Sequence, residues 1–226
     1  MKPFLVDTFF GGLRLIQRVT PFELLIRALP AQTKDSRAGV TEAWVVAHFI
    51  LSILVLTSLP RSAPRWLQGL VCGYGAFRVF EVVVFQFFSQ ILGGYPTKGR
   101  PRLHYTVVSL RRSILLAGLL YLETLVWFAA FYQIGSGCFK TDLPLDSVLV
   151  ALYYSTVTIT TLGYGDVSAI KPCGFSLVIV ETLVGFFMTL LILARVVSYL
   201  PAPRSTDPDE QAPVPQSGSS YDDDIT

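Results

Sequence analysis

Five consecutive residues, Thr161, Leu162, Gly163, Tyr164 and Gly165, combine two hydroxyl-bearing side chains with two glycines that are separated by one residue. Glycine adopts positive φ without steric cost, so glycine at alternate positions lets successive backbone carbonyl groups turn toward one side. A row of such carbonyl oxygens can replace the water around a cation. The run therefore predicts a segment whose backbone carbonyl oxygens face one side.

The segments around this run are apolar enough to lie in a membrane. Hydrophobic residues make up 52% of the 226 residues, charged residues only 15%, and the mean hydropathy is +0.53, which excludes an ordinary soluble domain. Roughly 20 apolar residues cross the hydrocarbon layer, and four stretches qualify. They are residues 43–59, 66–92, 113–134 and 174–200. A fifth stretch, 145–160, is too short to span and is predicted to be a re-entrant helix.

Residues 158–166, Thr-Ile-Thr-Thr-Leu-Gly-Tyr-Gly-Asp, are similar to the Thr-Val-Gly-Tyr-Gly-Asp signature of tetrameric potassium channels. Only Leu162 departs from it, in place of valine. The resemblance covers about 113–200 and implies an outer helix, a pore helix, a filter and an inner helix. It also implies that K⁺ is the permeant ion, bound by rings of carbonyl oxygens from residues 161–164 and by the Thr161 hydroxyl. Because the motif occurs once in the sequence, fourfold symmetry requires a homotetramer.

The resemblance also points to the residues that support the filter. Tyr153 matches a pore-helix aromatic residue that hydrogen-bonds the aspartate after the filter, here Asp166. Tyr153 and Tyr154 are the expected contacts of filter side chains that point away from the axis. Val157 stands where many relatives carry a glutamate behind the filter. Asp146 is expected to cap the pore helix, whose partially negative C-terminal end would favour a cation at the pore centre.

Gly185, in the last span, has two interpretations. By resemblance it lies where the inner helix of potassium channels often bends, which makes it a candidate gating hinge. It is alternatively a small residue that lets helices pack closely. The expected lining residues of the path below the filter are Thr189, Leu193 and Val197.

Several ionisable residues lie inside the spans, where they are costly and usually face protein. Arg78 and Glu81 are three residues apart and are predicted to form an internal pair. A voltage sensor would need repeated arginines and four helices before the pore, whereas Arg78 stands alone and two helices precede the pore. His48, Glu123 and Glu181 either sense protons or, more commonly, bond to neighbouring hydroxyl groups. By resemblance, Glu181 has a structural part.

Lys and Arg residues gather before the first span and between the second and third, which predicts that both segments and both termini are cytoplasmic. The turn 60–65, although it holds Arg61 and Arg65, and the segment 135–172 then face outside. The predicted organisation is an amphipathic interfacial segment, 1–40; two peripheral spans, 41–92; a basic loop, 93–112; the pore domain, 113–200; and a disordered acidic tail, 201–226.

Cys138 and Cys173 flank the pore segment on the predicted outer side, where disulfides persist. They are either bridged, which would staple the start of the inner helix, or free thiols. Cys72 lies inside the second span and is expected to pack there.

The sequence thus predicts an all-α membrane protein with four transmembrane helices, a re-entrant pore helix and a filter loop, assembled as a homotetramer in the plasma membrane. The predicted function is passive K⁺ conduction, with membrane lipids as partners and neither nucleic acid nor a small-molecule substrate. The alternative is a non-conducting regulatory subunit. An uptake transporter would need four pore loops in one chain. No enzyme is predicted, because His48 and His104 lie far apart without a partner motif.

Overall fold

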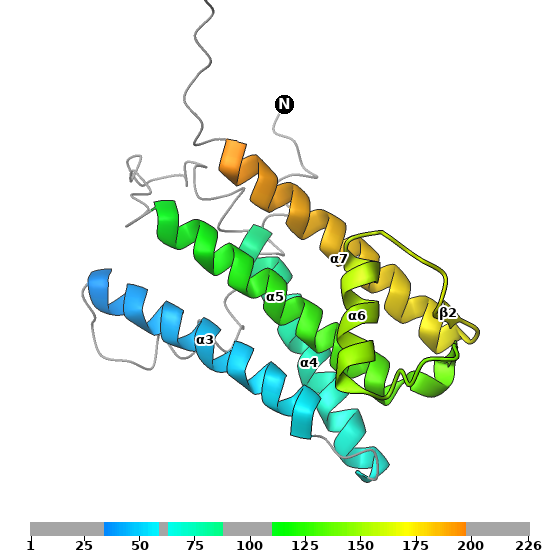
Figure 1. The fold of residues 1–226 in the computed structure, drawn as a ribbon. Helices are drawn as coiled ribbons and strands as arrows, with labels where there is room; N and C mark the ends of the chain where they lie inside the picture. The colour runs from blue at the N-terminus through cyan, green and yellow to red at the C-terminus, as the bar shows by residue number, and fades with distance from the viewer. Residues whose placement is uncertain (1–33, 59–62, 88–109, 198–226) are drawn as a thin grey trace, which may run out of the picture.

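The computed structural model describes residues 34–58, 63–87 and 110–197 (Figure 1). In chain order, its elements are α3 (Lys34–Ser58), α4 (Arg65–Phe87), α5 (Leu110–Ile134), η2 (Ser136–Cys138), β1 (Phe139–Lys140), α6 (Val148–Ile159), β2 (Ser168–Ala169) and α7 (Pro172–Val197). Helices α3, α4, α5 and α7 are long and apolar enough to cross a membrane, which confirms the four predicted spans. The short apolar helix α6 stands where the pore helix was expected.

Helices α3 and α5 begin earlier than the sequence predicted. The first starts at Lys34 and the second at Leu110, ahead of the predicted span starts at 43 and 113. Hydropathy marks only the apolar part of a helix, and polar residues can continue the same helix beyond the hydrocarbon layer. Apart from these helix starts, the predicted N-terminal segment, basic loop and acidic tail lie outside the described residues.

The start of α6 also differs from the prediction. Ser147 is the N-cap residue, without a side-chain capping bond, so the expected cap at Asp146 is wrong. The preceding residues form a turn in which the Ser147 N–H donates to the Pro144 carbonyl at 2.8 Å. The Asp146 carbonyl instead accepts a 2.8 Å bond from the Gln133 side chain of α5. The turn therefore delays the helix by about three residues relative to the apolar pattern.

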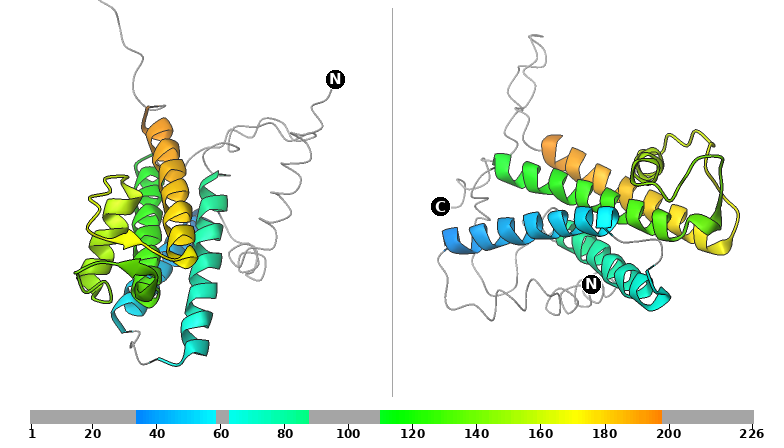
Figure 2. Two further views of the ribbon diagram at one scale, coloured as in Figure 1. Left: turned by 90° about the vertical axis from the view of Figure 1, so that its right-hand side faces the viewer. Right: turned by 60° about the horizontal axis from the view of Figure 1, so that its bottom comes forward.

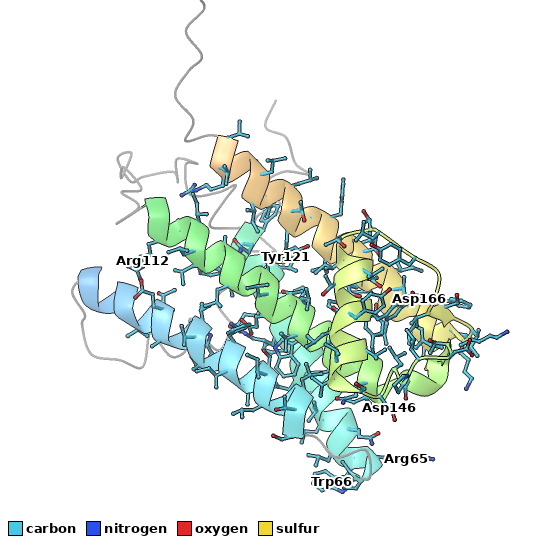
Figure 3. The ribbon with its side chains drawn as sticks, viewed as in Figure 1. Arg65, Trp66, Arg112, Tyr121, Asp146 and Asp166 are labelled. Carbon is cyan, nitrogen blue, oxygen red and sulfur yellow. A yellow bond between two sulfur atoms is a disulfide. The ribbon has the colours of Figure 1, made fainter. Side chains whose placement is uncertain are left out.

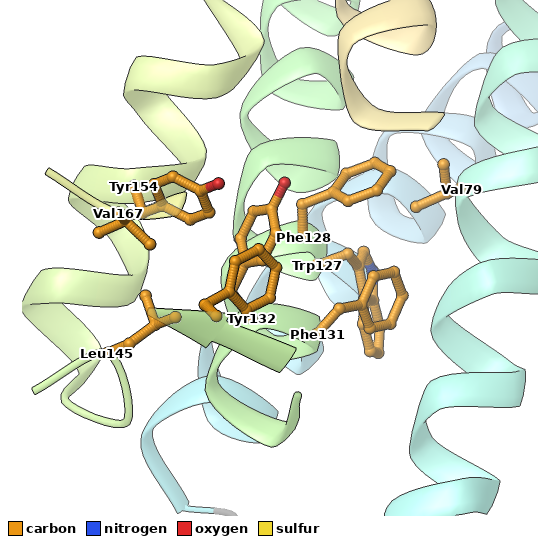
Figure 4. Close-up of a cluster of buried hydrophobic side chains, with 9 residues drawn as sticks. Val79, Trp127, Phe128, Phe131, Tyr132, Leu145, Tyr154 and Val167 are labelled. Carbon is orange, nitrogen blue, oxygen red and sulfur yellow. The ribbon is translucent and has the colours of Figure 1, made fainter. Parts of the chain in front are cut away.

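Helix α5 is the centre of the fold, since α3, α4, α6 and α7 all pack on it. Helix α6 lies obliquely against the long helices, at one end of the bundle (Figure 1, Figure 2). A buried, largely aromatic cluster joins α5 to α4, α6 and the pore loop (Figure 4). Its members include Trp127, Phe128, Phe131 and Tyr132 of α5, Val79 of α4, Tyr154 of α6, and Leu145 and Val167 of the flanking loops.

Two short strands close the pore loop. Phe139 pairs with Ala169 and Lys140 with Ser168, antiparallel. Next to this ribbon, Cys138 and Cys173 form a disulfide, which settles the alternative left open by the sequence. Arg112 lies at one end of α5, and Asp146 and Asp166, from the loops around α6, lie near its other end (Figure 3). The pore loop is therefore held at one end of the bundle by both hydrogen bonds and a covalent bridge.

Candidate functional site: the filter segment and its supports

The filter segment, residues Thr161 to Gly165, has an alternating backbone. Gly163 has φ of 55° and Gly165 has φ of 82°, which confirms the expectation that glycines occupy these positions for their conformation. Thr161 also has a positive φ, 60°. Among the residues that the structure describes, it is the only one other than glycine with a positive φ. A β-branched residue in the left-handed region is strained and needs surrounding structure to hold it.

That surrounding structure is the last turn of α6. The Val157 carbonyl accepts hydrogen bonds from the N–H groups of Leu162, at 2.9 Å, and Gly163, at 3.4 Å. The N–H of Thr161 donates to the Thr158 carbonyl at 3.0 Å. The inner half of the filter segment is thereby folded back onto the C-terminal end of α6. Val157 thus supports the filter segment through its backbone carbonyl.

The outer end of the filter segment is held by two tyrosines and Asp166. The Tyr153 hydroxyl donates to Asp166 Oδ2 at 2.7 Å, which confirms the predicted pair. This bond raises the pKa of the Tyr153 hydroxyl. The Tyr153 ring also stacks on that of Tyr164, with centroids 6.5 Å apart and planes at 5°. Asp166 further accepts from the Val167 N–H at 3.1 Å.

Tyr154 takes a different direction from Tyr153. Its ring is buried and packs edge-on against that of Tyr132, with centroids 4.6 Å apart (Figure 4). It also packs edge-on against the ring of Phe139, with centroids 5.5 Å apart. It therefore supports α6 from the core side, whereas Tyr153 contacts the filter segment itself.

A second set of contacts ties α6 to the two long helices of the pore domain. We call Tyr132, Ser155 and Glu181 the inner polar network. The Ser155 hydroxyl lies 2.5 Å from Glu181 Oε1 and 2.9 Å from the Leu125 carbonyl, so its one hydrogen can serve either acceptor. The Tyr132 hydroxyl donates to Glu181 Oε2. Glu181 thus bonds to hydroxyl groups, the more common arrangement expected for such a residue, and it joins α5, α6 and α7.

Gly185 lies one helical turn after Glu181, against the end of α6. A Cβ atom at this position would come within 2.9 Å of the Ile159 carbonyl oxygen and would also press on the Ile159 side chain. The two helices therefore meet at two points one turn apart, at Ser155 with Glu181 and at Ile159 with Gly185. This contact is the close approach expected if the glycine serves packing.

Much of the pore domain's apolar surface is uncovered in the single chain. The Leu162 side chain is 59% exposed and that of Tyr164 is 67% exposed. The three residues expected to line the path, Thr189, Leu193 and Val197, are exposed on α7. The supports of the filter segment are thus inside the chain, whereas Leu162, Tyr164 and this face of α7 are exposed.

The peripheral helices join the pore domain through a different kind of contact. We call Arg78, Glu81 and Glu123 the peripheral charge cluster. The Arg78 guanidinium binds both oxygens of Glu123, at 2.7 and 3.0 Å, and Glu81 Oε2 at 2.7 Å. The predicted pair of Arg78 and Glu81 is confirmed. Glu123 was expected to bond to hydroxyl groups, but it accepts its hydrogen bonds from the guanidinium group of Arg78, on another helix.

Sequence reasoning missed the long-range partners in both networks. Ser155 and Tyr132 carry hydroxyl groups inside largely apolar helices, and Glu123 is the single acidic residue in α5. A polar residue in an apolar helix signals that some partner exists, but spacing within one helix cannot say which helix supplies it.

Comparison with known proteins agrees with this geometry. Residues 119–201 match the ion channel family Ion_trans_2. Over 88 residues, 38% of this chain, the sequence is 34% identical to two pore potassium channel c of Oryza sativa subsp. japonica. The match spans 19% of the length of that relative. No solved structure matches the chain. The match and the four span-length apolar helices make the chain an integral membrane protein, and its residues 119–201 are similar to the ion channel family.

Proposed function

We propose that this chain is a subunit of a potassium-selective channel that conducts K⁺ passively through the filter segment. The observation that carries the proposal is the alternating backbone, with positive φ at Thr161, Gly163 and Gly165. A row of carbonyl oxygens that replaces the hydration shell of an ion requires such an alternation. The likeness to a potassium channel of rice supports K⁺ as the ion.

The assembly we propose is a homotetramer. One chain supplies one filter segment, and the exposure of Leu162 and Tyr164 leaves apolar surface for neighbouring copies to cover. Four copies around an axis would bring four filter segments together and would line the path below them with Thr189, Leu193 and Val197 of α7. Fourfold cyclic symmetry needs one head-to-tail contact between two different surfaces of the chain, repeated four times around the axis.

We further propose that the protein lies in the plasma membrane with both termini cytoplasmic. The disulfide between Cys138 and Cys173 suits an oxidising, extracellular side for the pore loop. Arg112, at the far end of α5, suits the cytoplasmic side. The alternative function, a non-conducting regulatory subunit, is less consistent with an intact and supported filter segment.

The first experiment measures reversal potential with purified full-length protein in planar bilayers under asymmetric K⁺ and Na⁺. We expect reversal near the potassium equilibrium potential. An open current that does not distinguish the two ions would refute the filter assignment. A tetramer that is silent under all conditions would favour the regulatory subunit.

A matched pair of substitutions tests the backbone argument directly. A Cβ atom would meet nothing within 4 Å at either Gly163 or Gly118, but Gly163 has φ of 55° whereas Gly118 lies within α5. Only Gly163→Ala therefore forces a side chain into a strained conformation, at a cost on the order of 1 kcal/mol or more. We expect Gly163→Ala to lose potassium selectivity in the bilayer assay and Gly118→Ala to retain it. Equal selectivity in the two variants would contradict the proposal.

A further inference from the structure

Glu181 is a fully buried acid whose hydrogen bonds are with hydroxyl groups. Its side chain is 0% exposed, in α7, one of the four helices long and apolar enough to span the membrane. Its Oε1 lies 2.5 Å from the Ser155 hydroxyl oxygen, and its Oε2 accepts from the Tyr132 hydroxyl. An ionised carboxylate buried in a membrane protein is costly unless a positive charge lies beside it.

The helices that pack on α7 do not supply that positive charge. Arg78 of α4 and Arg112 of α5 each bind other acids. The titratable groups within electrostatic reach of Glu181 on α5 and α6 are Tyr132 and Tyr154, and neither can carry a positive charge. Within the described ranges of the chain, Glu181 forms no ion pair. Burial therefore favours the neutral, protonated form of this side chain.

The Ser155 hydroxyl group favours the same form by a separate argument. Its oxygen lies 2.5 Å from Glu181 Oε1 and 2.9 Å from the Leu125 carbonyl oxygen. A hydroxyl group has one hydrogen, whereas a carboxylate and a carbonyl group only accept. With Glu181 ionised, one of the two contacts would join two oxygens that have no hydrogen between them. With Glu181 protonated, both contacts are hydrogen bonds.

We propose that Glu181 carries a proton in the folded protein at neutral pH, and that this proton completes a chain of hydrogen bonds that joins α7, α6 and α5. Tyr132 donates to Oε2 of Glu181, and the protonated Oε1 donates to Ser155. Ser155 then donates to the Leu125 carbonyl. The chain is neutral, and each hydroxyl group in it has a partner of the right kind.

The chain holds the pore helix close to the filter segment. Ser155 stands two residues before Val157, whose carbonyl accepts from the N–H groups of Leu162 and Gly163. Holding Ser155 therefore fixes the turn of α6 onto which the inner half of the filter segment folds back. Glu181 is thus a positioning residue, which acts on the filter segment through Ser155. This step, unlike the proton itself, rests on the proposed channel function.

Infrared difference spectroscopy of the full-length protein in liposomes tests the proton. At about pH 7 an exposed glutamate is ionised, so it lacks the C=O stretching band of a protonated carboxyl group. We expect the spectrum of the wild type minus that of Glu181→Gln to contain this band. Glu42→Gln is the control, because Glu42 is 48% exposed and pairs with Arg112, and its difference spectrum should lack the band. A Glu181 difference spectrum without the band would overturn the proposal.

Ser155→Ala gives a second test, which also decides the question if Glu181→Gln fails to assemble. The substitution removes the acceptor of the proposed proton, and a carboxyl group that loses a hydrogen bond absorbs at higher frequency. We expect the carboxyl band to move to higher frequency relative to the wild type. An unchanged spectrum in the carboxyl region would show that no proton joins Glu181 to Ser155.

Potassium flux from the same liposomes tests the positioning step. Glu181→Gln keeps a neutral donor and an acceptor, whereas Glu181→Leu has a similar volume and neither. We expect selective flux within about twofold of the wild type in Glu181→Gln and a loss on the order of tenfold in Glu181→Leu. Full flux in Glu181→Leu would refute positioning, and an equal loss in both variants would show that the negative charge is required. A wild type without selective flux would refute the proposed function, while the infrared bands would still decide the proton.

Discussion

Glu123 and Glu181 are both fully buried, on α5 and α7, yet they are held in opposite ways. Glu123 receives two bonds from the charged Arg78, whereas Glu181 bonds to the neutral hydroxyls of Tyr132 and Ser155. The first contact joins a peripheral helix to the pore domain. The second lies inside the pore domain, between the pore helix and the inner helix.

The difference teaches what each contact can tolerate. A guanidinium has fixed geometry and only donors, so its partner must remain an acceptor. A hydroxyl group both donates and accepts, so it can rotate when its partner changes. The peripheral charge cluster is therefore sensitive to any loss of charge, while the inner polar network can rearrange its hydrogens within an unchanged set of helices.

Glu123→Gln should have the largest effect of the substitutions that test this comparison. The new amide group would turn N–H donors toward the donors of buried Arg78, which would lose part of its compensation. Breaking a buried ion pair in this way costs about 3–5 kcal/mol. The measurement is the free energy of unfolding of the purified protein in detergent micelles.

A triple variant separates charge from packing in that result. Arg78→Met and Glu81→Gln, added to Glu123→Gln, remove the buried cation and its second acid as well, and replacing all members of a buried ion-pair cluster is often nearly neutral. We expect the triple variant to recover most of the lost stability. If it is no more stable than Glu123→Gln alone, the charge of Arg78 is not the source of the effect.

The comparison also shows which contacts can be predicted from the sequence. The pair of Arg78 with Glu81 was predictable, because residues three apart on one helix lie on the same face. The bonds of Arg78 to Glu123 and of Glu181 to Ser155 were not, because they depend on how helices far apart in the sequence pack. Hydropathy gave the spans but not the helix starts at Lys34 and Leu110, which lie in polar sequence.

The filter segment was the most predictable part of the site. Its two glycines at alternate positions predict positive φ there, and the bond of Tyr153 to Asp166 was expected from the resemblance to potassium channels. The positive φ of Thr161 was not evident, because the residue type disfavours it and the hydrogen bonds from the end of α6 impose it. The conformations that follow from residue type were therefore predictable, whereas the conformation that tertiary contacts impose on Thr161 was not.

Gly185→Ala should have an intermediate effect, on the hydroxyl-bonded side of the comparison. The added Cβ would lie 2.9 Å from the Ile159 carbonyl oxygen, and backbone cannot move aside as a flexible side chain can. Overpacking of this kind costs about 1–3 kcal/mol. Gly118→Ala is the control, since its Cβ meets open space, and it should leave the unfolding free energy unchanged or slightly higher.

The same pair of variants distinguishes the two interpretations of Gly185. A loss of stability confined to Gly185→Ala supports close packing of α7 on α6. Unchanged stability, together with a changed probability of channel opening in bilayers, would instead support a hinge.

Glu181→Gln should have the smallest effect, about 1 kcal/mol or less in unfolding free energy. The amide oxygen can still accept from Tyr132, and the amide nitrogen can donate to Ser155, whose hydrogen is then free for the Leu125 carbonyl 2.9 Å away. The replacement of Glu by Gln, which destabilises the contact of Glu123, is therefore tolerated at Glu181, because the partners of Glu181 are hydroxyl groups. If Glu181→Gln lowered the free energy of unfolding as much as Glu123→Gln, the inner polar network would also depend on charge. The two contacts would then differ only in which residues form them.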